Sequence, residues 1–277
     1  IMHFGLPPRF DANVKIIQVD ILAEEIGRNV PVEVGLVGDI QAVVGQLNAS
    51  LEAEPYTFPS DAAWRTTLGE KVAENKEFVQ NMMLDDSVPM GYYRVLREIR
   101  DQAPPGTLIQ AEGAQTMDIS RSVLMHSEPR ERLDAATFGT MGIGLAQAIA
   151  AQVVHPDRKV ICIEGDSAFG FSGMEVETAC RYRLPIVFVI INNNGIGGGF
   201  DELPENPFEN PPSAYTIGAG YEKMIEGFGG KGYAVRTPDE LSTSLKQALE
   251  DTMPSIINVH IDPNARAKPQ KHHWLTS

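Results

Sequence analysis

From residue 90 onward, short runs of hydrophobic residues alternate with longer segments in which hydrophobic positions recur every three or four residues. The first pattern is typical of strands and the second of amphipathic helices. Some runs are continuously apolar, as at residues 187–191, which indicates strands buried on both faces. Strands that alternate with helices favour a parallel sheet with right-handed crossovers. We therefore predict an α/β fold, a doubly wound parallel sheet, over residues 90–265.

The pattern also sets the expected elements. The predicted strands of the sheet cover residues 108–111, 160–164, 186–191, 233–235 and 255–261, and the predicted helices cover residues 92–100, 142–153, 174–182, 222–228 and 238–250. Before residue 90, the pattern predicts strands at residues 14–20 and 32–37 and helices at residues 24–26 and 39–51.

The N-terminal strands and helices are too few to close a doubly wound domain. We therefore treat residues 1–55 as an incomplete α/β unit. Residues 56–89 contain prolines and mixed charges and are predicted to be a linker with one surface helix at residues 70–82. Residues 90–265 form the main domain, and residues 266–277 form a basic C-terminal segment.

Composition and charge exclude several classes of protein. The chain has 277 residues, of which 43% are hydrophobic, and this is enough for a sizeable core. A net charge of −14 disfavours general binding to nucleic acid or to an anionic membrane. No apolar run approaches the ~18 residues that span a bilayer. Two cysteines, Cys162 and Cys180, cannot build a disulfide framework. We therefore expect an enzyme of the cytoplasm, with neither nucleic acid nor membrane as partner.

Three segments rich in small and polar residues follow predicted strands. They cover residues 112–116, 165–170 and 192–199. Because the carboxyl ends of parallel strands meet at one edge of a sheet, we predict three loops that converge on one ligand. Small residues allow backbone N–H groups to approach phosphate oxygens, and a helix at residues 174–182 would add a favourable dipole. Mg²⁺ prefers oxygen ligands, which Asp166, Asn193 and the carbonyl of Gly195 supply.

Taken singly, these signals have simpler interpretations. A Gly-Asp pair after a strand is more often a turn, and so is an Asn-Gly pair. The spacing favours function, because Gly165-Asp166-Ser167 and Asn192-Asn193 are separated by 24 residues that hold a predicted helix and a buried strand. This arrangement resembles the fingerprint of thiamine diphosphate enzymes, which runs from Gly-Asp-Gly to Asn-Asn. Ser167 replaces the third glycine of that fingerprint.

Longer segments resemble one branch of these enzymes. Residues 164–178, and Arg132-Leu133-Asp134 followed by residues 137–142, are similar to the family of 2-hydroxyacyl-CoA lyases and oxalyl-CoA decarboxylases. Residues 192–196 and 273–276 resemble the lyases more than the decarboxylases. The similarity extends over nearly all the chain. It implies a thiamine diphosphate-binding fold for the main domain, preceded by part of a central Rossmann-like domain.

The resemblance also implies the roles of individual residues. Asp166 and Asn193 would bind Mg²⁺ through their side chains and Gly195 through its carbonyl. The implied contacts of thiamine diphosphate are Ala114, Gln115, Thr116, Gly139, Thr140, Met141, Asp166, Ser167, Ala168, Asn193, Gly195, Ile196 and Gly197. Met141 would support the bend between the two cofactor rings, whereas without the family it reads as a core residue. The cofactor would supply the chemistry, and the protein its position and a dry site.

Coenzyme A contacts are implied in the same way. Arg121, Arg266 and Lys268 match them, and residues 266–277 would form a lid over coenzyme A, although a solvated tail is the simpler interpretation. In the decarboxylases, positions that match Asp20 and Asp39 contact the activator ADP, so ADP is a candidate ligand here.

One departure from the family concerns the acyl group. Where relatives carry Gly-Ile-Tyr, this chain has Gly195-Ile196-Gly197. We hypothesise that the space accepts a branched 2-hydroxyacyl group. Glu202, just downstream, is our candidate for the catalytic acid or base, against the simpler interpretation of an exposed acidic loop.

The resemblance predicts a carbon–carbon lyase that cleaves a 2-hydroxyacyl-CoA into formyl-CoA and an aldehyde or ketone. The alternatives are an oxalyl-CoA decarboxylase and a non-catalytic partner chain that keeps the fold. Family members also need a glutamate from a pyrimidine-binding domain, which these 277 residues do not contain. We therefore expect the C-terminal half of a protein about twice as long, or one chain of a split enzyme. Its partners would be an acyl-CoA substrate and either identical subunits or a chain that carries the missing domain.

Overall fold

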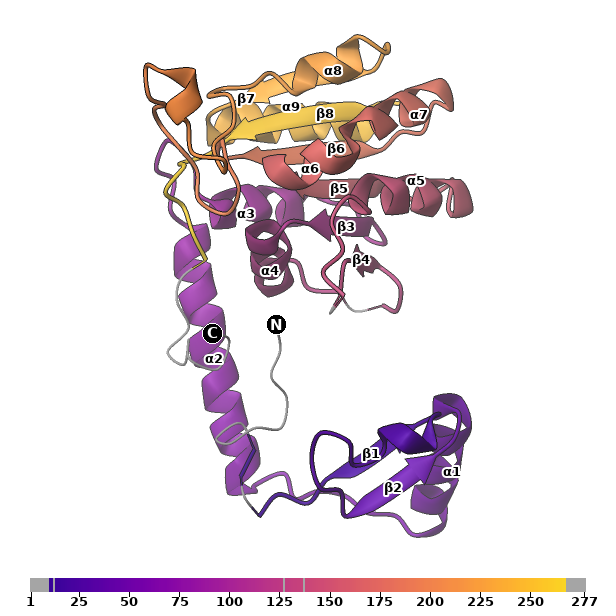
Figure 1. Cartoon of the computed structure of the whole chain (residues 1–277). Coiled ribbons are helices and arrows are strands. Elements are labelled where there is room, and N and C mark those ends of the chain that lie inside the picture. Colours follow the sequence, from indigo (N-terminus) through magenta and orange to yellow (C-terminus); the bar gives the residue numbers. More distant parts are fainter. Residues whose placement is uncertain (1–9, 12, 127, 137, 268–277) are drawn as a thin grey trace. The chain divides into compact units, whose positions relative to one another are not determined.

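The computed structural model describes residues 10–11, 13–126, 128–136 and 138–267 (Figure 1). The described residues divide into two compact units, a first unit over residues 10–72 and a second unit over residues 73–267. Across these residues, none of the helices has the length and the apolar character needed to cross a bilayer.

The first unit contains a pair of parallel strands followed by a helix. Its elements are β1 (Ile17–Asp20), a 3₁₀ turn (Ala23–Glu25), β2 (Val34–Val37) and α1 (Ile40–Ala53). The strands pair in parallel, with Ile17 opposite Val34. They begin three and two residues later than predicted, and the order of strands and helix is as predicted.

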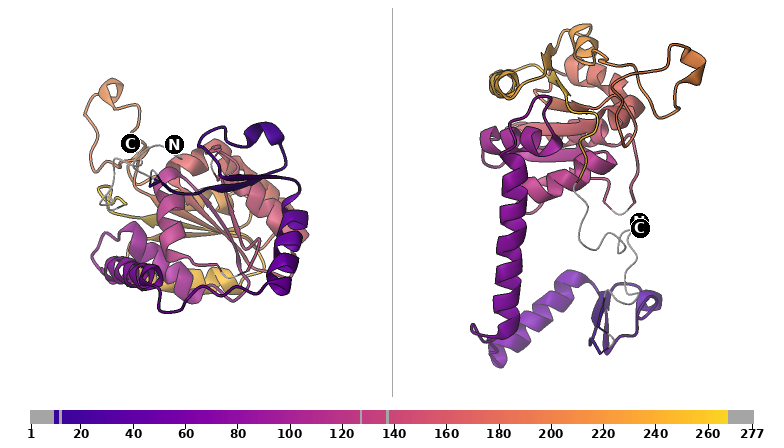
Figure 2. Two further views of the ribbon diagram at one scale, coloured as in Figure 1. Left: turned by 90° about the horizontal axis from the view of Figure 1, so that it is seen from below. Right: turned by 90° about the vertical axis from the view of Figure 1, so that its left-hand side faces the viewer.

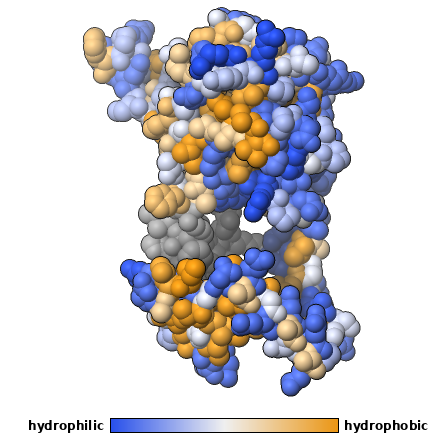
Figure 3. Space-filling model, turned by 90° about the vertical axis from the view of Figure 1, so that its right-hand side faces the viewer, coloured by the Kyte–Doolittle hydropathy of each residue, from blue (hydrophilic) through white to orange (hydrophobic). Residues whose placement is uncertain are grey.

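Helix α1 begins at a side-chain cap. The carboxylate of Asp39 accepts hydrogen bonds from the backbone nitrogens of Gln41, at 3.0 Å, and Ala42, at 3.1 Å, which satisfies two free N–H groups of the first turn. Val43 is buried, whereas Ile40 and Leu47 on the predicted apolar face are exposed. Figure 3 shows orange, hydrophobic patches over this unit. The hydrophobic face predicted for α1 is therefore largely uncovered within the unit.

Helix α2 (Ala63–Met83) is longer than the predicted helix at residues 70–82. The division between the two units falls within it, after Val72. The predicted linker at residues 56–89 therefore consists largely of one helix of 21 residues.

The second unit is built on a parallel sheet. In the part of this unit that the structure describes, six strands lie in the order β4-β3-β5-β6-β8-β7, and all neighbours are parallel. Their bounds are β3 (Leu108–Glu112), β4 (Arg132–Asp134), β5 (Val160–Gly165), β6 (Val187–Asn192), β7 (Lys231–Val235) and β8 (Ser255–His260). The doubly wound parallel sheet is thus confirmed. The short strand β4 was not predicted.

Helices cover both faces of this sheet (Figure 2). One face carries α3 (Tyr92–Gln102), α4 (Ala114–Val123) and α9 (Pro238–Glu250), and the other carries α5 (Gly144–Val154), α6 (Asp166–Ser172), α7 (Val176–Arg181) and α8 (Glu222–Glu226). Alternate strand residues feed the two cores: in β5, Ile161 packs in the first and Cys162 in the second. Because successive side chains of a strand point to opposite faces, a strand between two helix layers is apolar at most of its positions.

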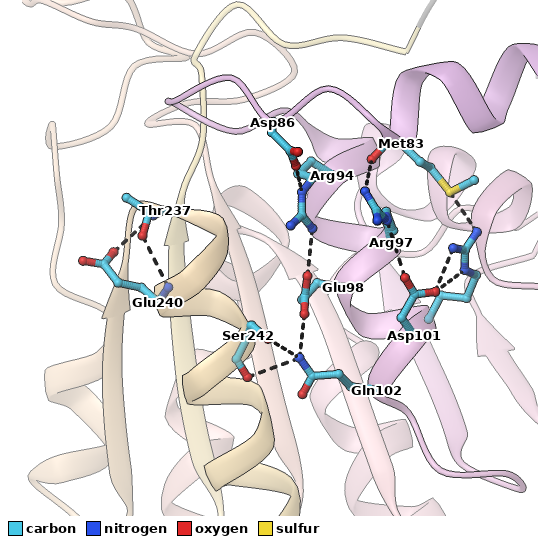
Figure 4. A network of polar contacts seen from close by, with 11 residues as sticks. Met83, Asp86, Arg94, Arg97, Glu98, Asp101, Gln102, Thr237, Glu240 and Ser242 are labelled. Atoms are coloured by element: carbon cyan, nitrogen blue, oxygen red, sulfur yellow. Dashed lines mark hydrogen bonds and ion pairs between the residues drawn. The ribbon is translucent and has the colours of Figure 1, made fainter.

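A chain of polar contacts joins two helices on one face of the sheet (Figure 4). On α3, Arg94 donates hydrogen bonds to Asp86, at 2.6 Å, and to Glu98, at 2.8 Å. Gln102, one turn further, donates to Glu98 at 2.6 Å and to the Ser242 hydroxyl of α9 at 2.9 Å. The contacts are spaced at four residues, so they lie along one side of α3. They fix α3 against α9 at the edge of the core.

Candidate functional site

The order of the strands defines a switch point in the second unit. From β3 the chain crosses to β4 through α4 on one face, and it returns to β5 through α5 on the other. The carboxyl ends of β3 and β5 are therefore neighbours from which the connections leave in opposite directions. In open α/β sheets, ligands bind in the crevice at such a point.

The first predicted loop turns sharply and enters a helix. Glu112 is the last residue of β3, Gly113 has a φ of 102°, and Ala114 begins α4. A Cβ on Gly113 would lie 3.4 Å from the backbone nitrogen of Gly165, so this turn is in contact with the end of β5. The buried Thr116 also lies beside Gly165, because its hydroxyl oxygen is 3.4 Å from the position that a Cβ on Gly165 would take.

The prediction of a second loop at residues 165–170 is wrong, because these residues are largely helical. Helix α6 begins at Asp166, directly after β5, and the Ser167 backbone nitrogen donates to the Asp166 carboxylate at 2.8 Å. Ala168 and Phe169 are buried and anchor this helix to the core. The helix predicted at residues 174–182 does not follow the strand directly, and it consists of a 3₁₀ turn and the shorter α7. Glycine and serine suggested a turn, whereas burial of the apolar pair stabilises a helix.

The third segment is a true loop after β6. The backbone nitrogen of Gly195 donates to the Asp166 carboxylate at 3.1 Å and to the Asn193 side-chain oxygen at 3.3 Å. Asn194 between them has a φ of 65°, in the left-handed region that asparagine tolerates. Asp166, Asn193 and Gly195 are all buried. The structure thus brings the three predicted metal ligands together.

The chemistry of these groups fits a divalent cation. Asp166 is 2% exposed, and burial raises its pKa to about 6 although backbone N–H groups, among them those of Ser167 and Gly195, lower it. A cation would favour the ionised carboxylate in this buried place. Carboxylate, amide and carbonyl oxygens are the ligands that Mg²⁺ prefers. Among the described residues, no group of three or more His, Cys, Asp and Glu side chains offers a competing metal site.

A pocket of about 540 Å³ adjoins Asp166. Its lining comes from α6 and from the segment after the third loop: Asp166, Ser167, Gly170, Phe171, Tyr215, Thr216, Ala219 and Tyr221. Burial, and secondly the charge of Asp166, raise the pKa of Tyr221 to about 12, so its hydroxyl keeps its proton at neutral pH. Sequence reasoning missed the two tyrosines, which lie in no recognisable motif.

Asn194 connects the loop after β6 to the wall of this pocket. Its side-chain oxygen accepts from the backbone nitrogen of Gly218 at 2.9 Å, and its carbonyl accepts from that of Tyr215 at 3.0 Å. Its amide nitrogen donates to the Phe200 carbonyl at 3.0 Å. Asn194 therefore organises two loops at once, which the sequence did not indicate.

The other predicted cofactor contacts differ in exposure. Thr116 and Ala168 are buried, Gln115 and Ser167 are half-buried, and Ala114, Gly139, Thr140, Met141, Ile196 and Gly197 are exposed. Met141 is 38% exposed, so it is not the core residue of the alternative interpretation. The carbonyl of Gly197 accepts from Arg266 at 3.3 Å, and Gln115 accepts from the backbone nitrogen of Ala267 at 2.8 Å.

The predicted coenzyme A and catalytic residues are more scattered. Arg121 on α4 pairs with Asp118, at 3.3 Å, and with Asp134, at 3.1 Å. Glu202 is exposed and is not among the residues that line the pocket. Lys268 and most of the predicted lid lie outside the described residues. The roles of these residues stay predictions.

The two aspartates considered for ADP have local partners. Asp20 accepts from the backbone nitrogen of Leu22 at 2.9 Å, and Asp39 caps α1. Neither contact involves a ligand, and ADP is not supported as a ligand of this unit.

Beside the switch point lies a buried pair of glutamates that sequence reasoning did not identify. Glu112 and Glu164 occupy paired positions of β3 and β5, and neither is exposed. Burial, and then the charge of Glu112, raise the pKa of Glu164 well above its ordinary value. A signal was present in the sequence. Gln110 and Glu112 are two residues apart on one predicted strand, and Cys162 and Glu164 are two residues apart on the next, so each pair lies on one face of its strand.

Comparison with known proteins gives two findings. A family model described as "Thiamine pyrophosphate enzyme, C-terminal TPP binding domain" matches residues 111–259. Proteins called 2-hydroxyacyl-CoA lyase 1 from Mus musculus and Homo sapiens are 50% identical across 100% of this chain. Oxalyl-CoA decarboxylase of Escherichia coli (strain K12) is 39% identical across 92% of the chain and 45% of its own length. The chain spans about half the length of the curated relatives it matches.

Proposed function

Because this chain belongs to the thiamine pyrophosphate enzymes, of which it contains the C-terminal cofactor-binding domain, we propose that it is the cofactor-binding half of a 2-hydroxyacyl-CoA lyase. The substrate would be cleaved into formyl-CoA and an aldehyde or ketone. Identity of 50% to proteins named 2-hydroxyacyl-CoA lyase 1 supports this activity over others of the family. The structural observation that carries the proposal is the contact between Asp166 and Gly195 at 3.1 Å, which joins the two halves of the metal site.

The reaction needs no oxidant or reductant. The hydroxyl group of the second acyl carbon loses its proton and becomes a carbonyl while the bond between the first and second acyl carbons breaks. The electron pair of that bond stays with the first carbon, which gains a proton and leaves as formyl-CoA. When bound, thiamine diphosphate supplies the nucleophilic carbon and the electron sink for this cleavage.

The protein supplies position and charge. Asp166, Asn193 and the Gly195 carbonyl would hold Mg²⁺, whose charge is shared with the diphosphate. Residues 114–116, Ser167 and Ala168 would bind the diphosphate through small side chains and backbone N–H groups. Met141 would support the two rings. Glu202 is the candidate group for the two proton transfers.

The acyl group is predicted to be branched. Gly197 is exposed, and a Cβ there would meet no atom within 4 Å. Relatives carry Gly-Ile-Tyr where this chain has Gly195-Ile196-Gly197, so the open space lies at the position of their tyrosine. This space supports a bulky or ketone-derived 2-hydroxyacyl group as substrate.

Oxalyl-CoA decarboxylase is the second candidate, since such an enzyme is 39% identical. A non-catalytic partner chain is the third, and the assembled group of Asp166, Asn193 and Gly195 counts against it. Release of CO₂ from oxalyl-CoA would distinguish the decarboxylase from a lyase, which forms formyl-CoA together with an aldehyde or ketone.

We propose further that the activating glutamate comes from a pyrimidine-binding domain, carried by the same protein in a homo-oligomer or by a partner chain. Acyl-CoA is the expected small-molecule partner, with Arg121, Arg266 and Lys268 as candidate contacts. Cys162 and Cys180 are both free and buried, in keeping with a reducing compartment such as the cytoplasm.

Heat stabilisation by thiamine diphosphate and Mg²⁺ tests the proposal. The melting temperature should rise when both are added and the pyrimidine-binding half is supplied, and it should rise little with either ligand alone. Formyl-CoA should then form from a 2-hydroxyacyl-CoA. Stabilisation without formation of formyl-CoA from either a 2-hydroxyacyl-CoA or oxalyl-CoA would favour a non-catalytic chain. The absence of stabilisation would contradict the cofactor site.

A further inference from the structure

We infer that Glu112 is a positioning residue, which holds the turn at residues 141–144 in place at the switch point. One oxygen of its carboxylate accepts from the backbone nitrogen of Gly142, and the other accepts from that of Gly144 at 2.5 Å. The donors lie 30 and 32 residues further along the chain. A single side chain therefore fixes the start of α5 against the end of β3.

A carboxylate suits this role for two reasons. Glu112 is 0% exposed, so water does not reach its carboxylate, and a buried donor that loses its acceptor is unfavourable. Gly144 is also the first residue of the 11-residue helix α5, where free N–H groups and the helix dipole favour a negative charge. An acceptor with two oxygens satisfies both N–H groups at once.

Close packing on two sides restricts the position of the turn at residues 141–144. A Cβ on Gly144 would lie 1.9 Å from a Glu164 oxygen and 2.8 Å from the second oxygen of Glu112. Gly142 has a φ of 81°, and a Cβ there would lie 3.0 Å from Phe171 of α6. The turn is thus held between the glutamate pair and the helix that begins with Asp166.

The consequence concerns Met141, which directly precedes the turn. This step rests on the proposed function, in which Met141 supports the cofactor rings. Glu112 then fixes the position of Met141 relative to those rings. Glu112 also directly precedes Gly113 and Ala114, where the predicted diphosphate segment begins. One carboxylate therefore links the support for the rings to the segment that binds the diphosphate.

The substitution Glu112→Gln tests this role, because it keeps the size of the side chain but replaces one acceptor oxygen with a donor. Amide hydrogen exchange in the cofactor-free chain should show protection at Gly142 and Gly144 reduced by roughly tenfold or more, the loss expected when a buried donor loses its acceptor. Protection in α9 should stay unchanged, which a merely destabilising substitution would not produce.

Glu164→Gln is the matched control. Glu164 is equally buried at the paired position, but the structure assigns it no bond to either glycine nitrogen, so protection at Gly142 and Gly144 should be retained. If Glu112→Gln does not fold, Glu112→Asp replaces it, since the shorter side chain cannot reach both donors. Unchanged protection at the two glycines in the folded variant overturns the inference.

A second readout separates this inference from the proposed function. The Kd for thiamine diphosphate, measured with Mg²⁺ in the protein that contains the pyrimidine-binding domain, should rise by about tenfold in Glu112→Gln. If the unsubstituted protein does not bind the cofactor, the proposed function fails, while the exchange experiment still decides the role of Glu112 in the turn. If exchange changes but the Kd does not, the link to Met141 is overturned.

Discussion

The carboxylate of Asp166 accepts a hydrogen bond from the backbone nitrogen of Gly195 at 3.1 Å, although 29 residues separate them in the chain. Asp166 begins α6 after β5, and Gly195 lies in the loop after β6. The contact exists because β5 and β6 are neighbours in a parallel sheet, so their carboxyl ends meet. A site made of two segments needs this contact.

We predict that Asp166→Asn weakens the Mg²⁺-dependent binding of thiamine diphosphate. The amide keeps the shape of the side chain but loses the charge, and the affinity for Mg²⁺ should fall by about tenfold or more, since even the loss of an outer partner of a metal site costs that much. Differential scanning fluorimetry with and without Mg²⁺, in the presence of thiamine diphosphate and the pyrimidine-binding half, measures the effect.

Two observations make this prediction specific. Because burial raises the pKa of Asp166 to about 6, the folded state disfavours its charge, and Asp166→Asn should leave the ligand-free chain at least as stable at pH 8. Asp118→Asn, an exposed carboxylate of α4, is the control and should keep the Mg²⁺ response. A normal Mg²⁺ response in Asp166→Asn would contradict the assignment.

Replacing Gly197 should change the choice of substrate. Gly197→Tyr fills the open space in the loop after β6. It should reduce kcat/KM for branched 2-hydroxyacyl-CoA by about tenfold relative to linear substrates, a steric loss of ~1.4 kcal/mol. Gly197 has a φ of 74°, so any side chain there strains the backbone. Gly197→Ala carries the same strain without the bulk and is the control. Equal losses on both substrates would contradict the prediction.

The sheet could be predicted because its signal is local. A strand buried on both faces is apolar at most of its positions, and residues 187–191 show this pattern by themselves. The predicted metal ligands also came from local signals, namely strand ends followed by short polar segments. The parallel topology then brought Asp166 and Asn193 together without further information.

What could not be predicted depends on contacts between distant residues. Helix α6 starts with turn-forming residues, and it is stable because Ala168 and Phe169 find a core that other strands supply. Glu112 looked like part of a polar loop, since its partners Gly142 and Gly144 are known only once α5 packs beside β3. The register of neighbouring strands determines which buried polar groups become partners, and one segment of sequence does not reveal that register.

The polar contacts between α3 and α9 predict a dependence of stability on pH. Although burial opposes it, hydrogen bonds from Arg94 and Gln102 hold the pKa of Glu98 below its usual range. The folded state therefore binds fewer protons than the unfolded state, so this stabilisation is present at neutral pH and is lost as the pH falls below about 4.5.

Glu98→Gln should accordingly lower the free energy of unfolding by about 1–2 kcal/mol at pH 7. The difference from the unsubstituted chain should be smaller at pH 3, because the stabilisation by the Glu98 charge is lost progressively as the pH falls below 4.5. Urea unfolding at both pH values measures this. Glu70→Gln, at an exposed position of α2, is the control and should have little effect at either pH. An equal loss at both pH values would show that charge is not involved.

The last prediction concerns the contact of α5 with the buried glutamate pair. A Cβ on Gly144 would lie 1.9 Å from a Glu164 oxygen, and Glu164 is fully buried, where close packing leaves a side chain little room to move. Gly144→Ala should therefore lower the free energy of unfolding by about 2–3 kcal/mol, the upper range for overpacking a core. Gly170→Ala in α6 meets no atom within 4 Å, and it should be neutral or stabilise by up to ~1 kcal/mol because alanine favours a helix.

A double substitution decides whether the clash is the cause. Glu164→Asp shortens the side chain and opens room at the first residue of α5, so it should restore part of the stability lost in Gly144→Ala. The coupling energy between the two substitutions should reach about 1 kcal/mol, because residues in contact are not additive. Additive losses would mean that the contact with Glu164 is not the cause, and would leave Gln110 and Glu112, each 2.8 Å from the position of that Cβ, as the groups that exclude a side chain there.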